Sequence, residues 1–234
     1  MKICIDAGHN NSGWDTGASG NGLREQDITW LIADKLRKLL ESVGITVVMT
    51  RTSNEQNVGV DLNSSLRRRV EICNKLGCDY FISIHCNAGG GTGSEVLVIA
   101  KGGKAEKLAE FVLKLVAQQT GKNRGVKESN AYVLKHTNCP AILVEAAFID
   151  TEADSLVLRF RHDEIAEAIF KGICEHCGIE QNKELESVND VVLELSNRGV
   201  VTDTEGMLDE INQNPNGRLY WLAKKFANHL REEH

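Results

Sequence analysis

Apolar positions along residues 1 to about 175 follow two alternating patterns. Short apolar runs, often β-branched, indicate buried strands, and the longer segments between them, with apolar residues every three or four positions, indicate amphipathic helices. The predicted strands cover residues 2–5, 45–49, 80–85, 95–99 and 141–145. The predicted helices cover residues 25–43, 62–76, 104–120 and 164–177.

This alternation predicts the fold class of residues 1–179. Strands separated by helices of this length are typical of an α/β layer fold with a mostly parallel sheet, because parallel neighbours need a crossover connection. A polar segment without periodicity, which we interpret as a linker, covers residues 180–187. Residues 188–234 show helical stripes but no strand pattern, and they predict a small all-helical C-terminal domain close to the lower size limit for independent folding.

The composition narrows the class of protein. With 41% hydrophobic and 26% charged residues, it is typical of a globular protein. No apolar run is long enough to cross a bilayer, so we expect no membrane partner. The N-terminus carries Asp6 and lacks the sustained apolar segment of a secretory signal peptide, so we expect synthesis in the cytoplasm.

Charge and cysteine usage exclude further classes. The net charge is −6, and the one basic run, Arg67-Arg68-Arg69, points around a helix, so we interpret it as a solvated helix surface and expect no nucleic-acid partner. The seven cysteines are an odd number in a chain long enough to build a core, which argues against a disulfide framework. Cys174 and Cys177 form a single Cys-x-x-Cys, which we interpret as helix-end thiols, with a metal or redox role as the alternative.

Three predicted strands are followed or ended by polar residues that packing does not require: His9, His85 and Glu145. Functional groups of open α/β sheets gather at the carboxyl ends of strands, and Glu25 lies near the start of the first predicted helix. Strand alternation puts His85 and Cys86 on opposite faces, and we favour His85 as a ligand because it leads into an open glycine-rich loop.

Two histidines and one carboxylate, with a fourth position left for water, are typical of a catalytic zinc site. Such a site also needs a base that takes a proton from the water, and Glu145 is the candidate. A histidine at a strand end is also common as a hydrogen-bonded surface residue, and the chain has no His-Glu-x-x-His sequence. Residue spacing alone leaves both interpretations open.

Five ordered blocks resemble the zinc-dependent N-acetylmuramoyl-L-alanine amidases of the amidase-3 type. The blocks are Ile5–His9, Leu23–Asp27, Ser83–Ala88, Asn123–Lys127, and Val133–Lys135 with Cys139–Glu145. The resemblance implies one zinc ion per chain, held by His9, Glu25 and His85. It implies Glu145 as the catalytic glutamate. It also implies a twisted sheet of about six strands flanked by helices.

The implied reaction is hydrolysis of the peptidoglycan amide between N-acetylmuramic acid and the L-alanine of the stem peptide. Asn87, Arg124 and Lys127 are predicted substrate contacts, with an exposed basic turn as the alternative for the latter two. After the catalytic glutamate the family usually has glycine-phenylalanine, whereas this chain has Ala146-Ala147-Phe148, with the phenylalanine but not the glycine, so fine substrate preference is open. A zinc peptidase acting on the stem peptide is a rival interpretation.

The C-terminal segment predicts a wall-binding or oligomerising module. Tyr220 and Trp221 are candidates for stacking against sugar, although both residues also suit the core of a helical bundle. An added module without a signal peptide favours a phage endolysin that lyses its host after release through a holin pore. The alternative is a bacterial autolysin that acts when a mother cell lyses.

Overall fold

The computed structural model describes the chain nearly throughout its first unit. The chain divides into two compact units, Met1–Glu180 and Gln181–His234. The described residues are 1–179, 192, 195–196, 203 and 206–208. The predicted linker, most of the predicted helical module, and both Tyr220 and Trp221 lie outside the described residues.

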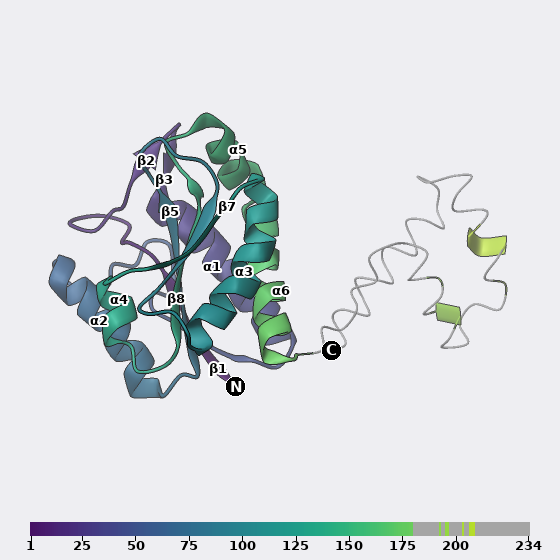
Figure 1. Ribbon diagram of the computed structural model, residues 1–234, viewed down its shortest axis with the longest axis horizontal. Coiled ribbons are helices and arrows are strands. Elements are labelled where there is room, and N and C mark those ends of the chain that lie inside the picture. Colours follow the sequence, from purple (N-terminus) through teal and green to yellow (C-terminus); the bar gives the residue numbers. More distant parts are fainter. Residues whose placement is uncertain (180–191, 193–194, 197–202, 204–205, 209–234) are drawn as a thin grey trace. The chain divides into compact units, whose positions relative to one another are not determined.

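One six-stranded sheet forms the centre of the first unit, in the order β4-β1-β5-β8-β6-β7 (Figure 1). The strands are β1 (Lys2–Ala7), β4 (Thr46–Met49), β5 (Tyr80–Asn87), β6 (Ser94–Val98), β7 (Asn123–Glu128) and β8 (Ala141–Phe148). Strands β4, β1, β5 and β8 are mutually parallel, whereas β6 pairs antiparallel with β8 and parallel with β7. The predicted mostly parallel sheet of about six strands is therefore confirmed.

Helices cover both faces of this sheet. Helices α1, α3 and α6 pack together on one face, and α2 and α4 lie on the other (Figure 1). The helices are α1 (Glu25–Ser42), α2 (Leu62–Leu76), α3 (Lys104–Thr120), α4 (Tyr132–His136), α5 (Glu152–Phe160) and α6 (His162–Cys177). In the described part of the chain, no helix combines the length and apolar character needed to cross a bilayer.

Several short elements were not predicted from the sequence. Strand β7 is a polar edge strand, and a strand with one unpaired edge needs no apolar alternation. Helix α4 has five residues, too few to show a helical period. A two-stranded hairpin, β2 (Ser19–Gly20) and β3 (Leu23–Arg24), is too short to recognise from hydropathy. Helix α5 (Glu152–Phe160) was also not expected.

Alternation along the strands divides the apolar side chains between two cores. Ile3 and Ile5 belong to the larger core, under α1, α3 and α6, whereas Cys4 between them faces the smaller core under α2 and α4. The same alternation on β5 sends Cys86 into the larger core, which confirms that His85 and Cys86 point in opposite directions. His85 therefore stays free of core packing.

The prediction of a uniformly solvated basic run is wrong for Arg69. The side chains of Arg67 and Arg68 are 65% and 64% exposed, whereas Arg69 is 2% exposed. Its Nη1 donates to Asp6 Oδ1 at 2.6 Å and its Nη2 to the carbonyl oxygen of His9 at 2.7 Å. A guanidinium has several donors in one plane, so a single buried arginine can satisfy the polar groups where β1 ends.

The buried carboxylate of Asp6 makes the stability of the fold dependent on pH. Burial opposes its charge, but Arg69 and hydrogen bonds from Thr50 and Ser83 lower the pKa of Asp6 below its ordinary value. A pKa that is lower in the folded state means that ionised Asp6 stabilises the fold above the unfolded pKa of about 4. That stabilisation is lost as the pH falls through the folded pKa.

We therefore expect Asp6→Asn to lower the free energy of unfolding at neutral pH. The difference from the wild type should shrink as the pH is lowered from about 5 to about 2, because the wild type then loses the same charge. Urea unfolding across this range measures it. Asp163→Asn, at an exposed residue, is the control. A difference that stays constant down to the lowest pH would contradict the assignment.

Candidate metal centre

The first candidate ligand, His9, lies two residues beyond the end of β1. Its backbone has a left-handed φ of 65°, a conformation in which histidine is enriched among non-glycine residues. The preceding Gly8 allows the close approach of His85, because a Cβ there would lie 2.5 Å from His85 Cε1 and 2.6 Å from the carbonyl oxygen of Ile84. The Asp-Ala-Gly-His sequence thus brings two histidine rings together.

The second candidate ligand, Glu25, is the first residue of α1 and is 3% exposed. Its Oε1 accepts a hydrogen bond from the backbone N–H of Cys86 at 2.9 Å, and its Oε2 accepts one from Ala18 at 2.8 Å. Two backbone donors from different segments therefore hold the carboxylate. The hairpin of β2 and β3 connects the loop after His9 to the start of α1, where Glu25 lies.

Three side-chain atoms converge where these elements meet. His9 Nε2 lies 3.0 Å from Glu25 Oε1, His85 Nδ1 lies 3.1 Å from the same oxygen, and the two nitrogens are 3.1 Å apart. Ligands about 2.0–2.1 Å from a tetrahedral zinc ion are roughly 3.3 Å from one another. The three predicted ligands thus have the donor types and nearly the spacing that zinc requires.

The charges of this cluster fit a cation. Burial opposes protonation of His9, but its hydrogen bonds to Asp15 and Glu25 raise its pKa to about 9. Burial likewise opposes the charge of Glu25, yet the hydrogen bonds from His85 and His9 hold the pKa of that carboxyl well below its usual range. The cluster attracts positive charge at its centre, and a metal ion would replace the bound proton.

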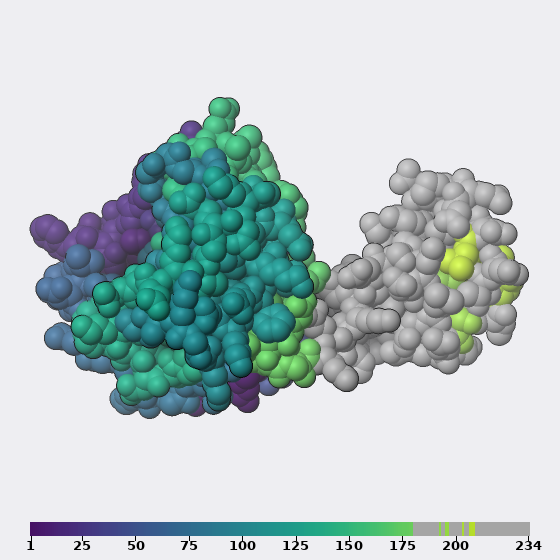
Figure 2. Space-filling model, viewed as in Figure 1, coloured from purple at the N-terminus to yellow at the C-terminus, as the bar shows by residue number. Residues whose placement is uncertain are grey.

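Asp15, which the sequence did not single out, fixes the orientation of His9. Its Oδ1 accepts a hydrogen bond from His9 Nδ1 at 2.8 Å, and its Oδ2 accepts one from Ser65 Oγ at 2.8 Å. Because Nδ1 is engaged, Nε2 is the nitrogen left for a metal. The loop that carries Asp15 lies against the segment leading into α2 (Figure 2). Asn10, in this loop, donates from its Nδ2 to the carbonyl oxygen of Val58, in that segment, at 3.1 Å.

We expect Asp15→Asn to weaken zinc binding by about 10–100-fold, because the carboxylate that aligns and polarises His9 is lost. Competition with a chromophoric zinc chelator measures the affinity. Asp34→Asn, which removes a carboxylate from surface ion pairs on α1, is the matched control and should leave the affinity unchanged. Equal affinities of the Asp15 variant and the wild type would refute the orienting role.

Glu145, the predicted base, lies within β8 rather than at its end, because the strand continues to Phe148. It pairs in register with His85 on one neighbouring strand and with Glu95 on the other. Its Oε2 is buried and has no hydrogen-bond partner among the described residues. Burial, opposed by His85 and reinforced by Glu25 and Glu95, raises the pKa of Glu145 to about 7.

A carboxyl group with an unpartnered oxygen and a pKa near neutrality can take up and release a proton at physiological pH. Glu145 also stands outside the group of residues whose ligand atoms converge, which comprises His9, Glu25 and His85. The structure therefore separates three ligand-type residues from one residue with the properties of a general base.

The three predicted substrate contacts meet at Glu95, which the sequence placed only in a strand. Glu95 Oε2 accepts from Arg124 Nε at 2.7 Å and from Lys127 Nζ at 2.5 Å, and Glu95 Oε1 accepts from Asn87 Nδ2 at 3.1 Å. Arg124 and Lys127 lie on the edge strand β7 rather than in a turn. Their contact with substrate stays a prediction.

The Cys-x-x-Cys pair occupies an ordinary structural position. Cys174 is completely buried in the larger core, and Cys177 packs against the same core from the end of α6. Within the described residues, neither thiol belongs to a group that could hold a metal ion. This placement agrees with helix-end thiols.

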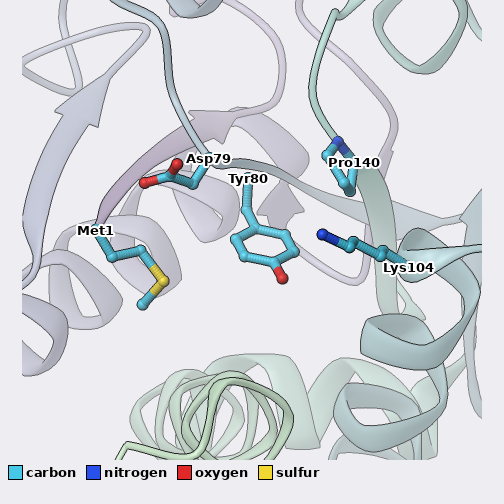
Figure 3. Close-up of a pocket in the computed structure, with 5 residues that line it drawn as sticks. All are labelled: Met1, Asp79, Tyr80, Lys104 and Pro140. Carbon is cyan, nitrogen blue, oxygen red and sulfur yellow. The ribbon is translucent and has the colours of Figure 1, made fainter.

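A cavity of about 340 Å³ lies apart from the candidate metal ligands (Figure 3). It is lined by Met1, Asp79, Tyr80, Lys104 and Pro140. The lining residues from the parallel strands precede or begin β1, β5 and β8, so the cavity is at the amino ends of these strands. The candidate ligands lie toward the opposite, carboxyl ends, and the cavity is therefore separate from the metal centre.

Comparison with known proteins places this arrangement in a family. The sequence profile described as N-acetylmuramoyl-L-alanine amidase (Amidase_3) matches residues 3–175. The sporulation-specific N-acetylmuramoyl-L-alanine amidase of Bacillus subtilis (strain 168) is 37% identical over 163 residues, which cover 68% of this chain and 60% of that protein. The endolysin of Bacillus phage SPP1 is 33% identical over 185 residues, which cover 74% of this chain and 65% of the endolysin.

Solved structures of amidases have a similar fold. The CwlD amidase of Clostridioides difficile, determined in complex with the GerS lipoprotein, superimposes with a TM-score of 0.67 at 29% identity, covering 76% of this chain and 99% of that one. The matched part spans only 60% and 65% of the two curated relatives. Because the family profile covers the sheet, its helices, the three converging residues and Glu145, the chain belongs to the Amidase_3 family of N-acetylmuramoyl-L-alanine amidases.

Proposed function

We propose that this protein hydrolyses the amide bond between N-acetylmuramic acid and the L-alanine of the peptidoglycan stem peptide, with one zinc ion per chain. The observation that carries the proposal is the convergence of His9, Glu25 and His85 next to Glu145, which pairs in register with His85 and whose buried Oε2 has no hydrogen-bond partner among the described residues. Family membership over residues 3–175 supports the substrate class.

The residues present fit the metal. Two imidazole nitrogens and one carboxylate oxygen form a donor set that zinc favours, and they leave further coordination positions for water and substrate. In our proposal His9 binds through Nε2, His85 through Nδ1 and Glu25 through Oε1. Bound there, zinc supplies Lewis acidity, which lowers the pKa of water and polarises the scissile carbonyl group.

The protein's own residues handle the proton. Glu145 removes a proton from the attacking water and transfers it to the departing amine of L-alanine, so that the amide C–N bond breaks with charge balanced. Its raised pKa suits both halves of this transfer. In this proposal Arg124 and Lys127, whose side chain is 44% exposed, contact the anionic stem peptide, and Asn87 joins them through Glu95.

Product analysis on purified peptidoglycan tests the reaction. We expect each cut to release an L-alanine amino terminus and to leave the glycan strands intact. Activity should disappear with a chelator and return with zinc. New amino termini from within the stem peptide, with the muramoyl–alanine amide intact, would instead indicate the zinc peptidase.

The biological role that we propose is lysis of a bacterial host by a phage endolysin acting on the wall after release. Similarity to the phage SPP1 endolysin supports it, whereas similarity to the sporulation-specific amidase favours an autolysin of mother-cell lysis. Expression in host cells with and without a holin separates the outcomes. Rapid lysis only with the holin is expected, and lysis without it would contradict release through a pore.

We further propose that residues 188–234 bind the wall, with Tyr220 or Trp221 stacking against sugar. Sedimentation with purified walls should recover the full chain and leave the truncated chain 1–179 in solution. Trp221→Ala in the full chain is the sharper variant. If the truncated chain sediments equally well, wall binding lies in the catalytic unit. Loss of an oligomer on truncation, with wall binding unchanged, would favour the oligomerising alternative.

A further inference from the structure

Four cysteines gather in the smaller core, away from the catalytic residues. They come from four segments: Cys4 from β1, Cys73 from α2, Cys78 from the turn after α2, and Cys139 from the loop before β8. The Sγ atoms of Cys4, Cys73 and Cys78 all lie within 4.8 Å of one another. Cys73 Sγ lies 3.7 Å from Cys139 Sγ.

The spacing of these sulfurs is close to that of a tetrahedral thiolate site. Zinc–sulfur bonds of about 2.3 Å place the sulfurs of a tetrahedron roughly 3.8 Å apart. The distance between Cys73 and Cys139 already has this value. The sulfurs of Cys4, Cys73 and Cys78 lie within 4.8 Å of one another, so they need to approach by at most about 1 Å, which is within the reach of cysteine side-chain rotation. Cys139 contacts only Cys73 within this group, and its side chain has to turn further toward Cys4 and Cys78 to complete the tetrahedron.

The surroundings allow an ion to enter and hold it in place. A cavity of about 90 Å³ adjoins the cluster. It is lined by Cys73, Asn74, Gly77, Cys78, Asn138 and Cys139. Cys139 is partly exposed, whereas Cys4 and Cys73 are buried among apolar residues of α2 and α4. An ion would enter past Cys139 and bind at a site closed to solvent on its other sides.

The thiols are protonated without a metal, and binding would displace those protons. The hydrogen bond with Cys73, together with burial, raises the pKa of Cys139 above its ordinary value. Each thiol that coordinates zinc releases one proton as its sulfur becomes a thiolate. Lys2, whose Nζ donates to the carbonyl oxygen of Leu76 at 2.8 Å, lies near Cys78 and offsets part of the resulting negative charge.

We infer that Cys4, Cys73, Cys78 and Cys139 form a second zinc site, structural rather than catalytic. Four protein ligands leave no position open for water or substrate, which is the mark of a structural zinc. The ion would join α2 to β1 and to the loop before β8, and so stabilise the layer that carries Arg69. A disulfide between Cys73 and Cys139 would need an oxidant and would leave Cys4 and Cys78 unused.

Cobalt substitution of the full-length, reduced protein tests this site separately from the catalytic one. Thiolate ligands give Co²⁺ an intense charge-transfer absorption in the near ultraviolet, and the histidine–carboxylate centre has no thiolate to contribute to it. We expect this absorption to saturate at about one Co²⁺ per chain. It should persist in His85→Ala, which removes a ligand of the catalytic centre.

Three variants locate the thiolates. Cys73→Ser/Cys78→Ser should lose the absorption. Cys139→Ser changes a partly exposed loop residue that the fold tolerates more readily, and it should lose one thiolate contribution and bind Co²⁺ at least about tenfold more weakly. Cys177→Ser, at a half-buried cysteine outside the cluster, is the matched control and should match the wild type. Circular dichroism checks that each variant is folded.

Three results would overturn the inference. The first is a reduced wild-type protein without the charge-transfer absorption. The second is a folded Cys139 variant with unchanged absorption and affinity. The third is a Cys73–Cys139 disulfide, found by mass spectrometry in protein purified with zinc present. None of these results bears on amidase activity, so this site and the proposed function can fail independently.

Discussion

Glu145→Gln is expected to lower the turnover of peptidoglycan by about 10²–10⁴-fold, the usual contribution of a general acid–base residue. Glutamine preserves the shape of the side chain but cannot take a proton from water. The three ligand-type residues are untouched, so the zinc content should remain that of the wild type. Release of L-alanine amino termini measures the rate, and elemental analysis measures the metal.

A matched control separates this effect from a general loss of charge. Glu110→Gln removes one carboxylate from an exposed position on α3, and it should leave the rate unchanged. Normal turnover by the Glu145 variant would show that another group takes the proton. Loss of zinc from that variant would instead make Glu145 a ligand, contrary to its position outside the converging group.

Arg69→Met is expected to destabilise the protein by about 3–5 kcal/mol, the typical cost of removing one partner from a buried ion pair. The methionine fills similar space, but Asp6 would remain buried without its cation, and the carbonyl oxygens of Ala7 and His9 would lose their donors. Urea unfolding monitored by circular dichroism gives the free energy of unfolding.

The neighbouring arginine supplies the control. Arg68→Met changes a side chain that is 64% exposed, and we expect a change of less than about 0.5 kcal/mol. The double variant Asp6→Asn/Arg69→Met should be less destabilised than the sum of the single variants, because the uncompensated charge is gone. Strict additivity would show that the Arg69 effect comes from packing alone.

The helices were the most predictable elements, for identifiable reasons. Helix α2 begins and ends where expected, since Asp61 and Ser64 form a capping box and Gly77 ends the helix with a left-handed φ of 59°. Helix α3 likewise ends before Gly121, whose φ is 72°. Strand β7 was missed because its polar residues lie on a sheet edge, where neighbours rather than side-chain hydropathy select the strand.

In the candidate site, too, some residues could be identified from the sequence and others could not. The residue types, the strand ends and the ordered blocks that resemble the family identified His9, Glu25, His85 and Glu145. Asp15 and Glu95 carried no recognisable pattern, because an acidic residue in a loop or strand looks the same whether or not it contacts a histidine or an arginine. Their roles depend on partners that are distant in sequence.

The sequence alone determined the α/β alternation, the order of the chemistry-bearing blocks and the family, because hydrophobic periodicity and residue identity are local properties of the chain. Only the tertiary structure decided that Arg69 is buried against Asp6, that three predicted substrate residues meet at Glu95, and that four cysteines distant in sequence pack in the smaller core. Contacts between distant segments follow from strand order and register, and these are set by the packing of the whole sheet.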